Sequence, residues 1–587
     1  MKIFYSAAFD NSGISSDTSK LRELENLGNI VLAYNYRTRG HQLSGNSLIS
    51  KERDDEIIKF CQGWLPDLII FSKCNGVDIR VFRELKKIAP LCYWFADPLV
   101  TYNNEEFFEK TKEADFFTCD KKNVYNVAMQ FNSNCFIVND GFDSMLEKPH
   151  DLQKQYDVSF IGNIYGDRKE KLSKIENKII FINDAFGPKH SKEVSKTKIN
   201  LNFCTTQGPS DRVFKVLAAG GFLLTDEWTE RKDFFTDGED LVIFKDSSDL
   251  NEKIQFYLQN DLERERIAAN GLAKVQEYTR EEWARKTLSI FQNMKFQKRC
   301  VKSKKSVLIA GPWVGEFGWE LFCWHGYIRS ISKYYDTTVC VSSRNSKFLY
   351  EDFCDFFVEF DPQNSGPRDS WHRGSFKLNH RHLKEILNQS GVDPKKDSVT
   401  FFPYRKIGNS PMIDLREKSQ LSLHYVSPTY KKLGSSKRDK KLIAIHARNR
   451  LIRPNDNWGK QRWESLVQKL IDSGYKIVCI GTKKESLLIK GAKDLRECAK
   501  EDLSEILSSS LCIMGESSGA MHLASLYCCP QIVWADWHKS AFSRDDNFRR
   551  YTKLWNPFET EVIFLDKYGA NPDPEYVFEK FIEWRSL

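Results

Sequence analysis

The sequence has no long apolar run and no clustered cysteines. No stretch of 18 apolar residues is present, the length that a membrane-spanning helix needs. The 15 cysteines include no Cys-x-x-Cys pair, and the adjacent Cys528 and Cys529 cannot easily bridge to each other. This usage favours reduced thiols over a disulfide framework or a zinc site. Because Asp10 interrupts the apolar start, we expect no signal peptide. The missing apolar run predicts no membrane-spanning segment, and the cysteine usage predicts a cytoplasmic location.

Signals for a catalytic metal and for nucleic acid binding are also weak. No convincing Asp-x-Asp motif or metal-ligand cluster occurs, so we expect no metal and no other cofactor. The formal net charge of +8 is a mild excess over 587 residues, which suits phosphate-bearing ligands without indicating nucleic acid. The 41% hydrophobic and 29% charged content is that of a folded protein. The length suggests about four domains.

Short apolar runs alternate with longer charged segments of helical period. Such alternation indicates βαβ units and parallel sheets, hence an α/β fold. In the first quarter, strands are expected at residues 3–5, 30–32, 68–71 and 92–95. The basic run after residue 294 indicates a solvated linker, with a phosphate-binding arm as the alternative. We predict domains at 1–150, 151–295, 306–435 and 436–587, with a linker at 296–305.

Two segments of the first half carry residues typical of a phosphate site. Open parallel sheets bind ligands at the carboxyl ends of their strands. Gly162 follows the apolar run 158–161 and opens a loop that ends at Arg168, whose guanidinium can grip phosphate oxygens. Alone, such a loop is more often structural. Arg212 lies near the start of a predicted helix, whose N-terminus adds positive potential.

The segment from Pro209 to Asp226, with 235–244 and 267–271, resembles the CgeB/YkvP-type glycosyltransferases of the GT-B fold. The resemblance extends over about residues 1–295, and a weaker one to the bacteriophage DNA β-glucosyltransferases lies in the same places. In such enzymes the second domain binds a nucleotide-sugar, and arginines hold its diphosphate. The resemblance therefore implies donor-binding roles for Gly162, Arg168, Arg212, Gly220, Gly221 and Asp226.

Lys215 departs from the family pattern, which usually has a glutamate here that holds the donor ribose. Lysine cannot accept those hydrogen bonds. Three interpretations remain: another residue holds the ribose, the nucleotide differs, or this half is impaired.

Asp97 is the candidate catalytic base of the first half. It follows the apolar run 92–95, and an inverting transferase needs a base for the acceptor proton. The phage-type enzymes have an aspartate in a similar setting. An equally good interpretation is that Asp97, which precedes Pro98, only starts the next helix.

Glu316 is the corresponding candidate in the second half. It stands in a turn that contains Gly311, Gly315 and Gly318 and follows the apolar run 307–310. A carboxylate at such a turn is a good general base. The alternative is a carboxylate that only stabilises a helix N-terminus.

A second turn in this half has the pattern of an anion site. An apolar strand ends, small residues expose backbone N–H groups, and a helix begins. The candidate donor-binding residues here are Glu516, Ser517, Ser518, Gly519 and His522. This half remotely resembles glycosyltransferase family nine, the heptosyltransferase-like GT-B enzymes, although an extra serine interrupts their motif. That resemblance also implies roles for Arg448 and Lys460 in donor binding.

We therefore predict an α/β protein of two tandem GT-B units, each with two Rossmann-like domains and a cleft between them. The predicted activity is transfer of a sugar from a nucleotide-sugar, the co-substrate, to an acceptor hydroxyl of a glycan or polysaccharide. One alternative is a glucosyltransferase-like enzyme that acts on hydroxylated DNA bases. Another is one catalytic half with one carbohydrate- or nucleotide-binding module, in which case Lys215 marks the first half as impaired.

Overall fold

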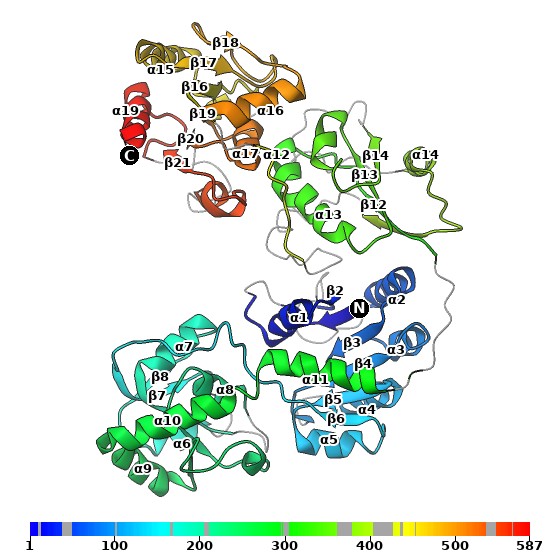
Figure 1. Ribbon diagram of the computed structural model, residues 1–587, viewed down its shortest axis with the longest axis vertical. Coiled ribbons are helices and arrows are strands. Elements are labelled where there is room, and N and C mark those ends of the chain that lie inside the picture. Colours follow the sequence, from blue (N-terminus) through cyan, green and yellow to red (C-terminus); the bar gives the residue numbers. More distant parts are fainter. Residues whose placement is uncertain are drawn as a thin grey trace. The chain divides into compact units, whose positions relative to one another are not determined.

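The chain folds into two compact units, one up to residue 305 and the other from residue 306 onward. They are called unit one and unit two below, and their elements are labelled in Figure 1. The computed structural model describes residues 1–9, 13–37, 50–99, 103–164, 168–204, 210–294, 296, 304–360, 379–402, 426–434, 438–451, 454–535, 548–565 and 567–586. Residues 297–303 of the predicted linker lie outside this set.

The first sheet of unit one is parallel throughout, in the order β2-β1-β3-β4-β5-β6. Its strands are β1 (Lys2–Ala7), β2 (Ile30–Asn35), β3 (Leu68–Ser72), β4 (Leu91–Phe95), β5 (Phe116–Cys119) and β6 (Cys135–Ile137). The expected strands at 3–5, 30–32, 68–71 and 92–95 fall within β1 to β4. The strand order reverses between β1 and β3, which makes that pair the switch point of the sheet.

Helices cover both faces of the first sheet, because successive strand residues point to opposite faces and both sets are apolar. Tyr5 packs with Trp283 on one face, and Phe71 stacks on Phe82 on the other. The helices are α1 (Ser16–Asn26), α2 (Lys51–Trp64), α3 (Ile79–Leu85), α4 (Asn104–Glu113), α5 (Lys122–Ala128) and α11 (Arg280–Asn293). Helix α11 follows the second sheet in sequence and returns to pack on α1.

The second sheet of unit one is also parallel, in the order β11-β10-β9-β7-β8. Its strands are β7 (Tyr156–Ile161), β8 (Ile179–Ile182), β9 (Thr197–Asn202), β10 (Leu223–Asp226) and β11 (Val242–Phe244). Its helices are α6 (Arg168–Ser173), α7 (Pro188–Ser195), α8 (Asp211–Ala218), α9 (Ser247–Gln259) and α10 (Asp261–Val275). The switch point lies between β7 and β9.

The third sheet opens unit two, in the parallel order β14-β13-β12-β15. Its strands are β12 (Ser306–Ala310), β13 (Thr337–Ser342), β14 (Phe356–Glu359) and β15 (Ser398–Phe402). Its helices include α12 (Phe317–Trp319), α13 (His325–Ser332) and α14 (His380–Ser390). Its switch point lies between β12 and β15.

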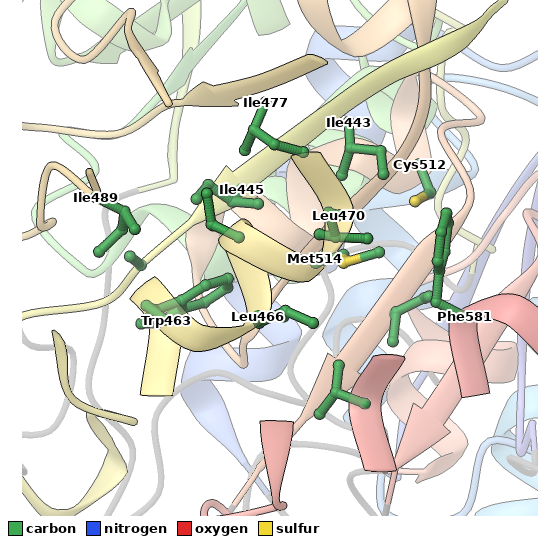
Figure 2. Packing of buried hydrophobic residues seen from close by; sticks show 14 of the residues in the cluster. Ile443, Ile445, Trp463, Leu466, Leu470, Ile477, Ile489, Cys512, Met514 and Phe581 are labelled. Carbon is green, nitrogen blue, oxygen red and sulfur yellow. The ribbon is translucent and has the colours of Figure 1, made fainter. Parts of the chain in front are cut away.

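The fourth sheet is parallel in the order β18-β17-β16-β19-β20-β21. Its strands are β16 (Asp439–His446), β17 (Lys476–Cys479), β18 (Lys493–Asp494), β19 (Ser510–Glu516), β20 (Gln531–Trp534) and β21 (Val562–Leu565). Its helices include α15 (Lys460–Asp472), α16 (Lys500–Ser509), α17 (Gly519–Leu526) and α19 (Pro574–Ser586). Figure 2 shows one core of this sheet, which includes Ile445 of β16, Leu466 of α15 and Phe581 of α19.

Four parallel sheets in two units confirm the predicted α/β fold class. No described helix is long and apolar enough to cross a membrane.

Candidate functional site

Arg212 lies across the switch point of the second sheet. Its Nε donates to the carbonyl of Ile161, the last residue of β7, at 2.7 Å, and its Nη1 donates to Oδ1 of Asn202, the last residue of β9, at 2.9 Å. Its Cζ lies 4.5 Å from the centroid of the Phe160 ring. Because α8 begins at Asp211, the positive end of that helix stands beside the guanidinium. The sheet thus fixes a cation at the edge where open parallel sheets bind ligands.

Gly162 makes room for that guanidinium. Its φ is +133°, and a Cβ built on it would lie 2.3 Å from Nη2 of Arg212. A glycine is therefore required both by the backbone conformation and by the close approach of Arg212.

Arg168 and Asp226 act as internal braces of the same edge. Arg168 is only 3% exposed and donates to the carbonyls of Asn163 at 3.0 Å and Phe203 at 3.2 Å. Asp226, at the end of β10, accepts from the Cys204 amide at 2.6 Å and from Lys171 Nζ at 3.1 Å. These bonds do not test the predicted contacts of Arg168 and Asp226 with the donor, which stay predictions.

Gly220 and Gly221 precede β10 and so lie at the amino edge of the sheet, opposite Arg212. Gly220 has φ of +71°, and a Cβ on it would lie 3.3 Å from Pro149. A Cβ on Gly221 would lie 2.5 Å from Val194. A tight turn and close packing account for both glycines, and their predicted donor role stays a prediction.

Lys215 is half-buried one turn into α8. Its Nζ lies 3.5 Å from Oδ2 of Asp211. Burial raises the pKa of Glu147 from its ordinary value, and the charge of Lys215 acts in the opposite direction. Lys215 therefore sits between two carboxyl groups near the start of α8.

Asp97 lies two residues beyond β4 and is paired with a lysine from the neighbouring strand end. Lys73 Nζ donates to Asp97 Oδ1 at 2.7 Å, and the Asp97 side chain remains 37% exposed. The carboxylate is thus both oriented and accessible.

Asp120 is a second carboxyl group at the same edge, which sequence reasoning missed. It directly follows β5, and burial raises its pKa to about 6. Lys121 Nζ lies 2.8 Å from both of its oxygens and donates to the carbonyl of Ala96 at 2.6 Å. The available signal was the one used for Asp97, an aspartate that ends an apolar run.

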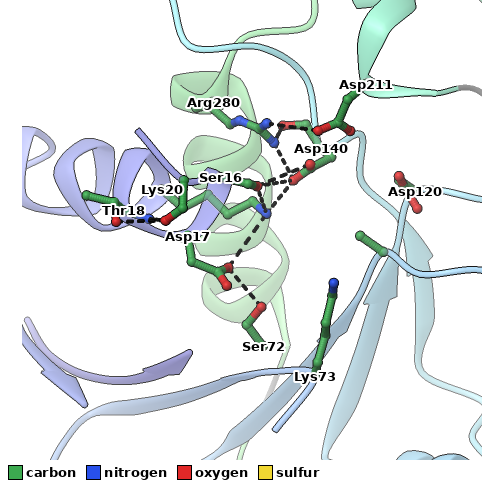
Figure 3. A network of polar contacts seen from close by, with 12 residues as sticks. Ser16, Asp17, Thr18, Lys20, Ser72, Lys73, Asp120, Asp140, Asp211 and Arg280 are labelled. Atoms are coloured by element: carbon green, nitrogen blue, oxygen red, sulfur yellow. Dashed lines mark hydrogen bonds and ion pairs between the residues drawn. The ribbon is translucent and has the colours of Figure 1, made fainter. Parts of the chain in front are cut away.

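A buried ion cluster joins the two sheets of unit one (Figure 3). Asp140 pairs with both Arg280 and Lys20, and Arg280 Nη2 lies 3.9 Å from Oδ2 of Asp211 at the start of α8. Burial alone would raise the pKa of Asp140, but the two cations hold it well below its usual range. The carboxyl edges of the first and second sheets are therefore linked through charged groups.

Glu316 lies immediately before α12 and contacts the fourth sheet. Its Oε1 accepts from Nη1 of Arg450 at 3.0 Å. Arg450 follows β16, and its Nε also lies 3.7 Å from Oε1 of Glu485. The predicted base of unit two is thus part of a chain of ion pairs.

Glu516, the last residue of β19, is buried at the switch point of the fourth sheet. Its carboxyl group accepts from the backbone N–H groups of Trp458 at 2.7 Å and Arg448 at 3.3 Å, and from Trp463 Nε1 at 3.4 Å. Burial raises its pKa to about 7. These contacts tie β19 to the segment after β16.

The turn after Glu516 is occupied by the protein's own side chains. Ser517 Oγ accepts from the Tyr551 hydroxyl at 2.8 Å, and Ser518 Oγ lies 3.1 Å from Nδ1 of His446. Burial lowers the pKa of His446 to about 4, so the imidazole is neutral at neutral pH. His522 stacks on Tyr551, with ring centroids 4.5 Å apart.

The N-terminus of α17 packs against α12. A Cβ on Gly519 would lie 3.3 Å from the Phe317 ring, and one on Gly318 would lie 3.4 Å from the His522 ring. Gly318 and Gly519 therefore allow the two turns of unit two to meet, and they place Glu316 and the Glu516 turn in one region.

Arg448 and Lys460 take different places. Arg448 is buried and donates to Asn457 Oδ1 at 3.0 Å. The Lys460 side chain is 62% exposed and lies 3.8 Å from Glu464 of its own helix. The structure thus brings Arg448 to Glu516 and leaves Lys460 on the surface of α15. In the described part of the chain, no group of three or more His, Cys, Asp or Glu residues could hold a metal ion.

In the comparisons with known proteins, a segment of unit one matches a family model. Residues 144–289, about a quarter of the chain, match the family described as glycosyl transferase-like. No curated protein matches the chain. The predicted resemblance of unit two to family nine stays a prediction.

Solved structures of low similarity are also found. HepE from Anabaena, in complex with UDP and glucose, is 11% identical with a TM-score of 0.38, and the match covers 50% of this chain and all of HepE. Sucrose-phosphate synthase from Thermosynechococcus elongatus is 11% identical with a TM-score of 0.39, covering 50% of this chain and 98% of that enzyme. T4 phage BGT, in complex with its UDP-glucose substrate, is 12% identical with a TM-score of 0.35, covering 49% and 99%. The glycosyltransferase resemblance predicted for the first half is confirmed over residues 144–289, the segment that contains Arg212 and matches the glycosyl transferase-like family.

Proposed function

We propose that unit one is a glycosyltransferase that moves a sugar from a nucleotide-sugar to an acceptor hydroxyl. The observation that carries this proposal is the position of Arg212, inside the segment that matches the family. Its guanidinium is bonded to the ends of β7 and β9 and stands beside the N-terminus of α8. A diphosphate is the ligand that such a fixed fork and helix end bind well.

The pre-set position of Arg212 favours affinity as well as specificity. A long side chain that is already held by two hydrogen bonds loses little conformational freedom when a ligand binds. Gly162 contributes by leaving the space that the guanidinium fills. We therefore assign the donor diphosphate to the carboxyl edge between β7 and β9.

The reaction that this arrangement supports is a displacement at the anomeric carbon. The acceptor oxygen forms the new bond to that carbon, and the bond to the diphosphate oxygen breaks. Asp97 takes the acceptor proton, and the nucleoside diphosphate leaves with its charge offset by Arg212 and α8. Because these groups supply positive charge, we propose catalysis without a bound metal ion.

Asp97 suits the role of base better than Asp120. Its side chain is part-exposed and ion-paired with Lys73, whereas Asp120 is buried against Lys121. An acceptor can therefore reach Asp97. Asp120 acts through Lys121, which donates to both the Asp120 carboxyl group and the Ala96 carbonyl next to Asp97.

For unit two we propose a binding module, because its own groups occupy its switch point. The hydroxyls of Ser517 and Ser518 are bonded to Tyr551 and His446, and Glu516 is enclosed by backbone donors. This assignment makes unit one the catalytic half despite Lys215. We propose a glycan or polysaccharide as the acceptor.

The test is thermal stabilisation of the full chain by common nucleotide-sugars, with wild type and Arg212→Lys. A ligand of the native state raises the melting temperature. Loss of charge-assisted hydrogen bonds in Arg212→Lys is expected to weaken donor binding about 10- to 100-fold. Arg450→Lys is the matched control in unit two and should bind donor normally.

Three outcomes would each overturn one part of this proposal. Stabilisation that survives Arg212→Lys and disappears in Arg450→Lys places the donor in unit two. Loss of transfer after treatment with EDTA, restored by Mg²⁺ or Mn²⁺, contradicts metal-independent catalysis. Transfer to a hydroxylated DNA oligonucleotide, with none to oligosaccharides, replaces the glycan acceptor.

A further inference from the structure

The turn after β3 has an uncommon backbone conformation. Lys73 and Cys74 are consecutive residues with φ of +58° and +53°. This left-handed region is unfavourable for residues other than glycine, and two consecutive residues seldom adopt it. Residues held in such conformations tend to gather at functional sites.

A buried set of hydrogen bonds holds this turn in place. Lys110 Nζ donates to the carbonyl of Cys74 at 2.6 Å, and Arg53 Nη2 donates to the carbonyl of Gly76 at 2.6 Å. The amide of Gly76 donates to Glu106 Oε1 at 2.7 Å. Lys110 and Arg53 are both buried, and burial lowers the pKa of Lys110 although Glu106 acts against the shift. Two buried cationic side chains thus donate hydrogen bonds to the backbone of the turn after β3.

This support determines where the Lys73 ammonium lies. The residue follows β3 directly, at the switch point between β1 and β3, and its amide donates to the carbonyl of Trp94 in β4 at 3.0 Å. Its Nζ donates to Asp97 Oδ1 at 2.7 Å. Figure 3 shows the side chain extending from the strand end toward the region of Asp120 and Asp140. Backbone and side chain of Lys73 therefore both contact the strand that carries Asp97.

A lysine without a function would be a poor choice at this position. Glycine adopts a φ near +58° without steric cost, so a lysine at this position is explained best by a role of its side chain. A part-exposed ion pair contributes little to stability, and the hydrogen bond that Lys73 donates to Asp97 orients the carboxylate.

We propose that Lys73 is a positioning residue, held in a strained turn so that its ammonium orients the Asp97 carboxylate toward the acceptor hydroxyl. This inference rests on the proposed function, in which Asp97 is the base.

The experiment compares Lys73→Gly, Lys73→Ala and Lys73→Arg in the full chain. Lys73→Gly removes the ammonium and relieves the backbone, so kcat should fall about 10-fold or more with donor KM within about twofold, while the melting temperature stays or rises. Lys73→Ala keeps the backbone strain. Its kcat should fall as much as that of Lys73→Gly, and its melting temperature should be lower than that of Lys73→Gly. Lys73→Arg restores a cation and should recover part of kcat.

Glu559→Gly is the matched control for strain relief. Glu559 is exposed in unit two with φ of +52°, and its replacement should leave kcat unchanged. Wild-type kcat in Lys73→Gly would overturn the inference, and so would a fall of kcat and melting temperature together. If Asp97→Asn abolishes transfer while Lys73→Gly keeps the wild-type kcat, the proposed function stands and only this inference fails. If Asp97→Asn is also active, the base assignment fails.

Discussion

Units one and two share one architecture but differ in what their second sheets hold at the switch point. In unit one, Arg212 bridges the ends of β7 and β9 with its guanidinium. In unit two, the ends of β16 and β19 carry His446 and Glu516, and Glu516 is 1% exposed. The first arrangement holds a cation at the ligand-binding edge, and the second holds a neutral imidazole and an enclosed carboxyl group.

The comparison shows that a parallel sheet specifies the place of a site and not its content. Strand order determines which edge can bind a ligand, while the side chains at two strand ends determine its charge. A diphosphate gains from the positive charge of Arg212, and neither His446 nor Glu516 offers such a charge. Unit one is therefore the better candidate for catalysis, and the predictions below test that difference.

The largest expected difference is between two variants, each of which replaces one candidate base with its amide. Asp97→Asn should lower kcat by about 10²- to 10⁴-fold, because an amide cannot take the acceptor proton. Glu316→Gln should leave kcat nearly unchanged, since Glu316 belongs to unit two, which we propose to be a binding module. Both variants are measured by sugar transfer to acceptor at saturating donor. The reverse pattern would make unit two the enzyme.

A smaller effect, on donor binding, is expected when Gly162, which contacts the Arg212 guanidinium, is replaced by alanine. In Gly162→Ala the new methyl group would collide with the guanidinium, and displacement of Arg212 should weaken donor binding about 10-fold. Gly238→Ala is the control, because Gly238 has φ of +78° and open space around its Cβ position. Titration calorimetry with donor compares the two. Equal losses would show that backbone strain alone is responsible.

The smallest effect concerns stability and pH in unit two. Burial raises the pKa of Glu516 from its ordinary value of 4.5 to about 7. Between these two pH values the native state keeps a proton that the unfolded chain has released. The contribution of Glu516 to native stability is thus greatest below pH 4.5 and falls by about 3 kcal/mol as pH rises to 7. Calorimetry from pH 4.5 to 8 should show this slope for unit two.

Glu516→Gln provides the comparison for that slope. Glutamine does not titrate, so the unit-two transition of the variant should depend less on pH over the same range. An unchanged slope would assign the dependence to other groups, such as Asp120 of unit one, whose pKa of about 6 acts in the same direction.

Much of the candidate site could be predicted because strand ends are visible as the ends of apolar runs. Asp97 and Gly162 were found in this way, and Arg212 was found from its place near the start of a predicted helix; each lies at the carboxyl edge of its sheet. Asp120 has the same signal and was missed, because nothing local distinguishes a buried carboxyl group from a capping one. Gly220 and Gly221 precede their strand, so their position at the opposite edge could have been inferred from order alone.

The sequence by itself determined the α/β class, the parallel strands and the turns that follow them, because apolar periodicity and glycine positions act locally. Only the tertiary structure decided which strands are neighbours, and with them the switch points. It also decided that Arg168 is buried under backbone carbonyls while Arg212 spans two strands. The left-handed turn at Lys73 has no local signal, since buried residues from α2 and α4 impose it. These features depend on contacts between residues distant in sequence, and local sequence patterns therefore do not predict them.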